Sequence, residues 1–313
     1  MHSLRDKRVL VSGSHGFIGV HLCASLRGMG AQVIGVSRRA RASEVPGMEV
    51  HDVDLVDGEA IRRLIEDTCP EFVVHLAGAR ERTLELGEFG PSYKVNLLGT
   101  LNLVQACRAV GCPSRFVSLG TCEEYGDGTV PFDETQREAP VSAYGVSKLA
   151  ATHLLEAVSR TCQFPAVVLR PTNVYGPGQG EEMFVPALVT ALLCGREFAM
   201  TAGEQTRDYV YVADLVDAII GALELQVPCG VVNIGSGVPV RIKEIALLAA
   251  RSIGPTASKL LRLGSRDYRP GEPMNYWTSI GRASRLLRWR PRVSLEEGLE
   301  RTVASIRRTG RFE

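Results

Sequence analysis

The sequence predicts an α/β fold built on a doubly wound parallel sheet. Short apolar runs alternate with helical patterns through the first half of the chain, and a glycine-rich turn joins the first apolar run to the first helix. Such alternation implies right-handed crossovers and a parallel sheet with helices on both faces. The length of 313 residues, 45% of them hydrophobic, is sufficient for the large core that this fold requires.

The first half of the chain supplies most of the expected elements. Strands are expected at residues 9–12, 32–36, 48–53, 72–76, 115–119 and 166–169. Helices are expected between them, at residues 17–27, 57–68, 92–110 and 142–160. Together they form a predicted first domain over residues 1–170, to which residues 212–235 return.

The second half is less regular and begins with a cluster of turn residues, namely Pro171, Gly176, Pro177, Gly178 and Gly180. Helices are expected at residues 183–193, 213–224, 242–252 and 295–307, and a strand at residues 231–234. Ligands of doubly wound sheets bind at the carboxyl ends of the strands. We therefore expect a smaller, discontinuous C-terminal substrate lobe over that edge, comprising residues 171–211 and 236–313.

Three glycines at spacing three follow the first expected strand. Gly13 permits the tight turn, Gly16 lets the backbone approach a pyrophosphate, and Gly19 lets the helix pack close to the sheet. The pyrophosphate would lie at the N-terminus of the helix. The pattern at this position predicts a Rossmann-type dinucleotide-binding domain, although a strand, turn and helix that bind nothing would show the same glycines.

The end of the second expected strand bears on the choice of dinucleotide. It carries Arg38 and Arg39 and no acidic residue, which favours NADP over NAD because a guanidinium pairs with the 2′-phosphate. A solvated basic loop is the alternative. Asp54, after the third strand, could accept a hydrogen bond from the adenine amino group or be an ordinary turn residue. We also expect these neighbours of the strand ends to line the cofactor site: Phe17, Ile18, Leu55, Leu76 and Ala77.

Tyr144 and Lys148 lie one helical turn apart on the same face of an expected helix. An ammonium beside a phenol favours the phenolate, so the pair can take a proton from a hydroxyl group or return it. Such a spacing also occurs by chance. Thr121 adds weight, because it follows the fifth strand and should lie at the same edge of the sheet.

The chain resembles an extended short-chain dehydrogenase/reductase of the nucleotide-sugar epimerase/dehydratase family. The resemblance covers nearly the whole chain and is carried by the glycine motif, Tyr144-x-x-x-Lys148 and three segments at residues 170–178, 203–214 and 269–273. It implies that Thr121, Tyr144 and Lys148 are catalytic and that Tyr144 and Lys148 also contact the cofactor, Lys148 at the nicotinamide ribose.

The resemblance further implies a nucleoside-diphosphate sugar as the substrate. Asn173, Arg207 and Arg269 would hold its diphosphate, since an Arg fork pairs bidentately with phosphate oxygens. Both arginines could instead be ion-paired or surface residues. The sugar would be oxidised at C4, with energy from binding the nucleotide used to orient it.

Cys122 and Glu123 bear on the reaction that follows C4 oxidation. A carboxylate at the position of Glu123 resembles the dehydratases of the family, and it could remove the C5 proton that the C4 ketone acidifies. Cys122 stands where other dehydratases have Asp or Ser and resembles a 5,6-dehydratase, so its thiol could donate a proton to the C6 hydroxyl. Equally, Cys122 could be packed in the core, and Glu123 could be solvated or cap a helix.

These residues predict a nucleotide-sugar dehydratase. A nucleotide-sugar 4-epimerase and a 4-keto-sugar reductase are the alternatives within the family. An NADP-sensing binding protein on the same fold is the alternative outside enzymes, and the intact Thr, Tyr and Lys set disfavours it.

The charge and composition of the whole sequence argue against several other classes of protein. The formal charge of +1 does not favour nucleic acid or an acidic membrane surface as a partner. Residues 1–7 are polar, and no apolar run approaches the length of a membrane span, so we expect a cytoplasmic protein. The eight cysteines lack the spacing of zinc ligands, so no metal is expected. We also expect a homodimer.

Overall fold

The computed structural model describes residues 4–38, 45–80, 85–225, 230–269 and 271–310. Seven strands form the central sheet: β1 (Arg8–Ser12), β2 (Gln32–Ser37), β3 (Glu49–Asp52), β4 (Phe72–His75), β5 (Arg115–Leu119), β6 (Ala166–Pro171) and β11 (Gly230–Ile234). Their order is β11-β6-β5-β4-β1-β2-β3, and all neighbouring pairs are parallel. The predicted fold class is confirmed.

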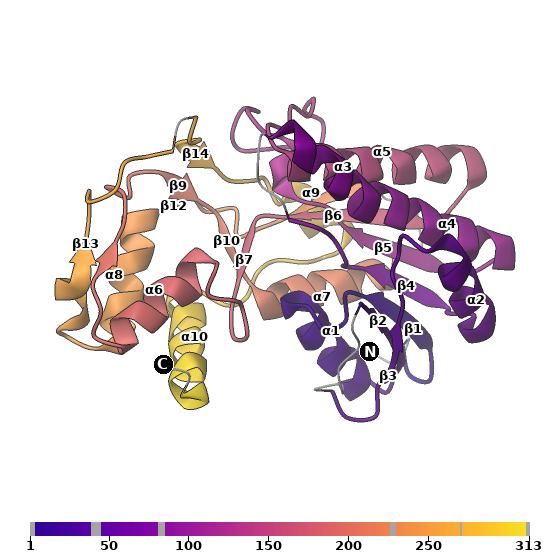
Figure 1. Cartoon of the computed structure of the whole chain (residues 1–313), viewed down its shortest axis with the longest axis horizontal. Helices are drawn as coiled ribbons and strands as arrows, with labels where there is room; N and C mark the ends of the chain where they lie inside the picture. Colours follow the sequence, from indigo (N-terminus) through magenta and orange to yellow (C-terminus); the bar gives the residue numbers. More distant parts are fainter. Residues whose placement is uncertain (1–3, 39–44, 81–84, 226–229, 270, 311–313) are drawn as a thin grey trace.

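Helices cover both faces of this sheet (Figure 1). One face carries α1 (Phe17–Gly28) and α7 (Val212–Leu223). The other face carries α2 (Gly58–Thr68), α4 (Gly99–Val110) and α5 (Ala143–Cys162). The strand order reverses between β1 and β4, and in doubly wound sheets a crevice for ligands opens at such a point.

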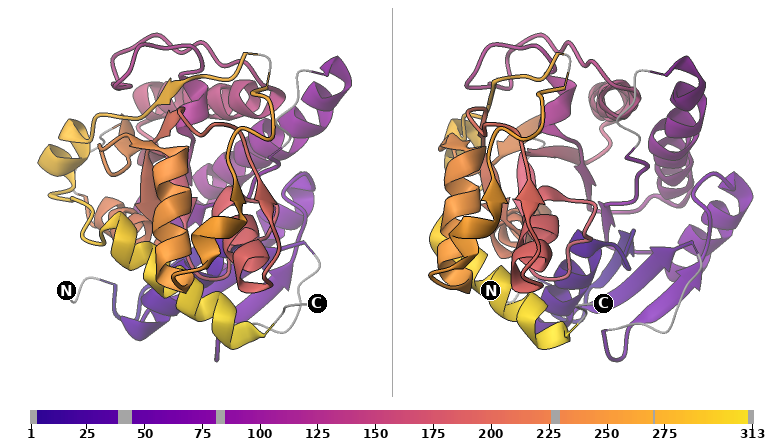
Figure 2. Two further views of the ribbon diagram at one scale, coloured as in Figure 1. Left: turned by 90° about the vertical axis from the view of Figure 1, so that its left-hand side faces the viewer. Right: turned by 60° about the vertical axis from the view of Figure 1, so that its left-hand side comes forward.

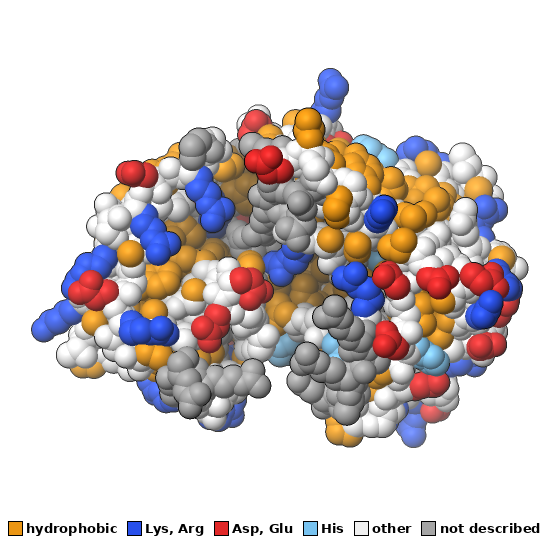
Figure 3. All heavy atoms as spheres, viewed as in Figure 1, with side chains coloured by type: hydrophobic (Ala, Val, Ile, Leu, Met, Phe, Trp, Pro, Cys, Tyr) orange, Lys and Arg blue, Asp and Glu red, His pale blue; other side chains and the backbone are white. Residues whose placement is uncertain are grey.

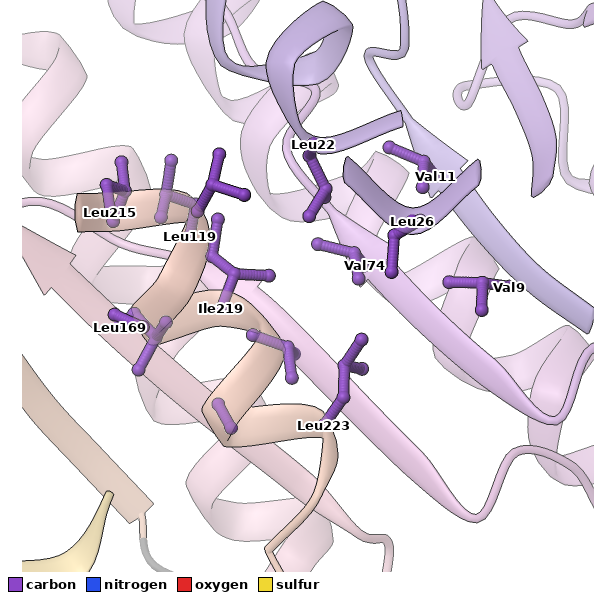
Figure 4. Close-up of a cluster of buried hydrophobic side chains, with 14 of the residues drawn as sticks. Val9, Val11, Leu22, Leu26, Val74, Leu119, Leu169, Leu215, Ile219 and Leu223 are labelled. Carbon is purple, nitrogen blue, oxygen red and sulfur yellow. The ribbon is translucent and has the colours of Figure 1, made fainter. Parts of the chain in front are cut away.

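Alternation along the strands explains both cores. Val9 and Val11 of β1 point into the core beneath α1 and α7, whereas Leu10 between them points into the core beneath α2 and α4. Figure 4 shows Val9 and Val11 beside Leu22 and Leu26 of α1. A strand that is buried on both faces therefore needs a continuous apolar run.

The helix expected at residues 92–110 is present, and it runs without a break from Phe89 to Val110. The sequence did not indicate the π-helical segment (Lys94–Leu98) that lies between α3 (Phe89–Tyr93) and α4. Within the π-helical segment, the Asn96 side chain accepts a hydrogen bond from Ala79 N at 2.8 Å and donates to Ser147 Oγ at 2.8 Å. These bonds join three elements that are distant in sequence, and no local pattern reports them.

The second lobe contains short strands that the sequence did not indicate (Figure 2). They are β7 (Asn173–Tyr175) with β10 (Tyr209–Tyr211), β9 (Thr206–Arg207) with β12 (Val240–Arg241) and β14 (Asn275–Tyr276), and β8 (Phe198–Ala199) with β13 (Leu261–Arg262). Helices α6 (Phe184–Leu193), α8 (Ile242–Ile253) and α10 (Leu295–Thr309) pack together beside them. Strands of two or three residues are too short to show periodicity.

Residues 280–289 depart from the predicted domain division. They include the short helix α9 (Gly281–Leu286), and Ala283 and Trp289 are buried in the core beneath α1 and α7. Trp289 Nε1 donates to the carbonyl oxygen of Asp214 in α7 at 2.9 Å. This segment therefore packs with the first domain, although the sequence assigned it to the second lobe.

Gly19 lies where a side chain cannot fit. A Cβ atom there would be 2.1 Å from Gly13 O and 2.9 Å from Ser14 Cα. We expect Gly19→Ala to lower the free energy of unfolding by about 1–3 kcal/mol, the usual cost of overpacking, as measured by urea denaturation. Gly28→Ala in the same helix is the control, because no atom from outside its own stretch of helix lies within 4 Å of its Cβ position. Equal stability of the two variants would contradict this close packing.

Among the residues placed in the structure, no helix has the length and apolar character needed to cross a membrane. Within the same ranges, no group of three or more His, Cys, Asp or Glu side chains could hold a metal ion. The cysteines that the structure places carry free thiols.

Candidate active site

A cleft of about 450 Å³ lies at the carboxyl edge of the sheet, between the sheet and the second lobe. Figure 3 shows this face hollowed between the two halves of the molecule, with apolar side chains inside the hollow. Its walls come from the turns after β1, β2, β3, β4 and β5, from the start of α5, and from residues of the second lobe that include Asn173, Met183 and Tyr276.

The glycine turn after β1 forms one end of the cleft. Gly13 has φ of 75°, and its N–H donates to Val36 O at 2.8 Å, which fixes the turn against β2. Gly16 is the N-cap of α1 and no side chain caps the helix there, so the first N–H groups remain available to an anion. This backbone fits a dinucleotide pyrophosphate.

The other predicted cofactor residues also lie at the cleft. It is lined by Gly13, Gly16, Phe17, Ile18, Gly19, Arg38, Asp54, Leu55, Leu76, Ala77, Tyr144 and Lys148. Asp54 is exposed, and its carboxylate accepts a hydrogen bond from Val56 N at 3.0 Å, as a turn residue does. Arg39 lies outside the described residues.

Thr121, Tyr144 and Lys148 meet in the cleft from two elements. Ser142 caps α5 by accepting from Gly145 N at 3.0 Å, which places Tyr144 in the first turn and Lys148 one turn later. Thr121 caps the 3₁₀ turn η3 (Cys122–Glu124) directly after β5. A Cβ on Gly145 would be 2.9 Å from Glu123 O, so this glycine lets α5 approach η3 closely.

Lys148 is 6% exposed in the wall of the cleft. Burial lowers the pKa of Lys148 to about 8, and the charge of Glu124 opposes this shift. Burial and the charge of Lys148 lower the pKa of His75 in β4 to about 3, so its imidazole is neutral. Lys148 is therefore mostly protonated at neutral pH and supplies the positive charge that Tyr144 requires.

Adjacent residues in η3 have opposite surroundings. Glu123 is half-buried and lines the cleft. Cys122 is fully buried, packs with Tyr125 and Phe132, and donates its thiol to Arg170 O at 3.2 Å. Burial raises the pKa of the Cys122 thiol well above its usual value. The structure corrects the expectation that Cys122 donates a proton in the cleft, because its thiol points into the core.

The predicted substrate residues are only partly brought together. Asn173 lines the cleft and donates to Asp208 O at 3.2 Å. Arg207 is not among the lining residues; it is paired with the Glu272 carboxylate and donates to Pro273 O at 2.8 Å. Its guanidinium lies 5.9 Å from the ring centre of Tyr276, which does line the cleft. Arg269 is exposed and also lies outside the lining.

Sequence reasoning missed several lining residues. Arg80 follows β4, so the rule that ligands bind at strand ends could have found it. Its Nη2 atom lies 3.5 Å from Met183 Sδ, which joins the turn after β4 to the start of α6. Gln179, Met183 and Tyr276 come from the second lobe, where no local pattern indicates a cleft.

Comparisons with known proteins agree with this geometry. A family model described as the NAD dependent epimerase/dehydratase family matches residues 9–235. A dTDP-glucose 4,6-dehydratase of Neisseria gonorrhoeae is 30% identical, over 97% of this chain and 96% of that protein. A UDP-glucose 4-epimerase of Mycolicibacterium smegmatis is 32% identical, over 96% of this chain and 98% of that protein.

Solved structures extend the same likeness to the fold. The crystal structure of UDP-glucose 4-epimerase with UDP-glucose from Thermotoga maritima is 31% identical, with a TM-score of 0.89 over 96% of this chain and 99% of that chain. The match of the family model spans more than half of the sequence and includes the glycine turn, Thr121, Tyr144 and Lys148. The chain therefore belongs to the NAD dependent epimerase/dehydratase family of enzymes.

Proposed function

We propose that this enzyme oxidises the hexose of a nucleoside-diphosphate sugar at C4 and then dehydrates it. Tyr144 takes the proton of the C4 hydroxyl, the Lys148 ammonium favours the phenolate, and the Thr121 hydroxyl bonds to the same oxygen. A nicotinamide cofactor, held by the glycine turn and Lys148, would supply the hydride acceptor for this oxidation. Asn173 orients the substrate at the side of the second lobe.

The placement of Glu123 carries the dehydratase proposal. Glu123 lines the cleft two residues after Thr121, and its backbone carbonyl lies beside the start of α5. A C4 ketone acidifies the C5 hydrogen, so Glu123 can remove that proton while the C6 hydroxyl leaves as water. Return of the hydride and a proton to the sugar would then complete the cycle, so that the net change is the loss of one water. Since Cys122 is buried, the proton that completes this water comes from a different group.

A 4-epimerase is the second candidate, and the burial of Cys122 favours it. Epimerisation needs oxidation at C4 and return of the hydride to the opposite face of the sugar, for which Thr121, Tyr144 and Lys148 suffice. It needs no acid at C6. The chain is about as similar in sequence to UDP-glucose 4-epimerases as it is to the dTDP-glucose 4,6-dehydratase, which also supports this candidate.

A panel of nucleotide sugars, analysed by mass spectrometry after separate incubations with the oxidised and the reduced forms of NAD and NADP, tests both candidates. Loss of the mass of one water supports the dehydratase. A new isomer of unchanged mass supports the epimerase. A gain of two hydrogens in the presence of reduced cofactor contradicts both candidates. So does the absence of any reaction with the uridine, thymidine, guanosine and cytidine diphosphate sugars.

We also propose a preference for NADP, supported by Arg38 at the cleft and by the absence of an acidic residue at the end of β2. Replacing Arg38 and Arg39 by Ala is expected to weaken NADP binding by about 1–3 kcal/mol, the usual contribution of charge-assisted hydrogen bonds. Binding of NAD should change little, since it lacks the 2′-phosphate. Fluorescence titration of the cofactor-stripped protein measures both affinities, and equal losses, or a parent that prefers NAD, would reject the proposal.

A homodimer is our further proposal. Apolar side chains gather over α3, α4 and α5 in Figure 3, and Leu98 before α4 is 37% exposed. A second copy of the chain could cover this surface and bury it.

A further inference from the structure

An ion-pair cluster is buried behind Thr121, and the chemistry proposed above does not use it. Glu124 and Arg170 are both fully buried, and Arg170 Nε donates to Glu124 Oε2 at 2.7 Å. Arg170 Nη2 donates to Glu138 Oε1 at 2.8 Å, and the guanidinium lies 4.7 Å from the ring centre of Tyr125. A buried ion pair is weak evidence for stability, because removing two charges from water is costly.

The second oxygen of Glu124 connects this cluster to the cleft. Glu124 Oε1 accepts a hydrogen bond from Thr121 N at 2.9 Å. Thr121 Oγ1 in turn accepts from Glu123 N at 3.2 Å, which leaves the hydroxyl hydrogen free to point to another acceptor. Glu124 therefore holds the backbone of Thr121, and the turn it closes orients the hydroxyl.

Gly120 shows that the chain makes room for this carboxylate. A Cβ on Gly120 would lie 2.5 Å from Glu124 Oε1 and 3.0 Å from Val168 Cγ1. The carboxylate is thus seated against the backbone at the end of β5, where any side chain would displace it. Arg170, one residue before the end of β6, holds the carboxylate from the neighbouring strand.

We propose that Glu124, held by Arg170, is a positioning residue that aims the Thr121 hydroxyl and supports the charge of Lys148. The inference rests on the proposed roles of Thr121 and Lys148. Glu124 touches neither substrate nor cofactor, since it is fully buried and absent from the cleft lining. It acts through the Thr121 hydrogen bond and through its negative charge.

The negative charge of Glu124 also acts on the buried ammonium of Lys148. Burial lowers the pKa of Lys148, and Glu124 raises it, so loss of the carboxylate should lower that pKa further below about 8. The other titratable neighbours are His75 from β4, which is neutral, and Tyr144 on the same helix. Removing Glu124 should therefore narrow the alkaline side of the pH profile of turnover.

Glu124→Gln and Glu138→Gln form a matched pair of variants. Each removes one carboxylate from Arg170, but only Glu124 is bonded to Thr121. With the nucleotide sugar that the panel identifies, we expect Glu124→Gln to lower kcat by about 10- to 100-fold with little change in KM, as misplacement of a reacting group does. Glu138→Gln should stay within about twofold of the parent. Equal losses in both variants would overturn the proposal.

NMR of lysine gives a readout that needs no substrate. The sequence contains five lysines, so a protein labelled with ¹³C-lysine gives five Cε signals, and Lys148→Arg identifies the one that belongs to Lys148. The Lys148 signal should titrate at lower pH in Glu124→Gln than in the parent, and at the parental pH in Glu138→Gln. An unchanged titration in Glu124→Gln would contradict the electrostatic role.

Two further variants keep the outcomes distinct. If Glu124→Gln fails to fold, Glu124→Asp takes its place, because it retains the charge but its side chain is too short to reach both Thr121 N and Arg170. We then expect kcat to fall while the pH at which Lys148 titrates stays near that of the parent. A kcat equal to that of the parent would reject the positioning role. Thr121→Val tests the underlying site. If Thr121→Val turns over at the parental rate, the proposed function is wrong, whereas loss in Thr121→Val without loss in Glu124→Gln rejects this inference alone.

Discussion

Replacing Tyr144 by Phe is expected to lower turnover by about 10²- to 10⁴-fold, the usual contribution of a general acid or base. The change removes one hydroxyl group and leaves the ring and the helix α5 in place. Affinity for the nicotinamide cofactor should therefore stay near that of the parent. Steady-state turnover on the substrate found by the panel, together with cofactor titration, measures both quantities.

The variant Lys148→Ala is the comparison for Tyr144→Phe. It removes the ammonium that favours the phenolate, and it also removes a cation from the wall of the cofactor cleft. Turnover and cofactor affinity should both fall in this variant. A Tyr144→Phe enzyme that turned over near the parental rate would show that the active site is elsewhere.

Glu123→Gln separates dehydration from epimerisation. The substitution leaves Thr121, Tyr144 and Lys148 in the cleft, so oxidation at C4 should proceed, but removal of the C5 proton should be slowed by about 10²- to 10⁴-fold. We expect the absorbance of reduced nicotinamide to rise and persist while no dehydrated product forms. In the parent enzyme, the product made in heavy water should carry solvent deuterium.

A 4-epimerase gives the opposite results. Glu123→Gln would keep its activity, and no solvent deuterium would enter a carbon position, because the hydride that leaves C4 is returned to C4. Parental turnover of Glu123→Gln on the true substrate would remove the dehydratase proposal and leave 4-epimerisation. Glu123→Asp keeps the carboxylate and should recover part of any lost activity, which distinguishes a proton-transfer role from a packing role.

The sequence alone determined the features that depend on residues close together in the chain. The run Val9-Leu10-Val11 requires burial on both faces, so it predicts a strand inside a parallel sheet. The spacing of Gly13, Gly16 and Gly19 predicts the phosphate turn, and the separation of four positions from Tyr144 to Lys148 places them one above the other on a helix. Backbone conformation and helical repeat act locally, so a single sequence is enough to show them.

Only the tertiary structure decided what depends on distant partners. Cys122 and Glu123 are neighbours, yet the 3₁₀ turn buries one and places the other in the cleft. The pairing of Arg207 with Glu272 spans 65 positions, and that of Arg170 with Glu124 spans 46. Hydrogen bonds, ion pairs and burial depend on which segments meet in space, and a pattern within one segment carries no information about its partner.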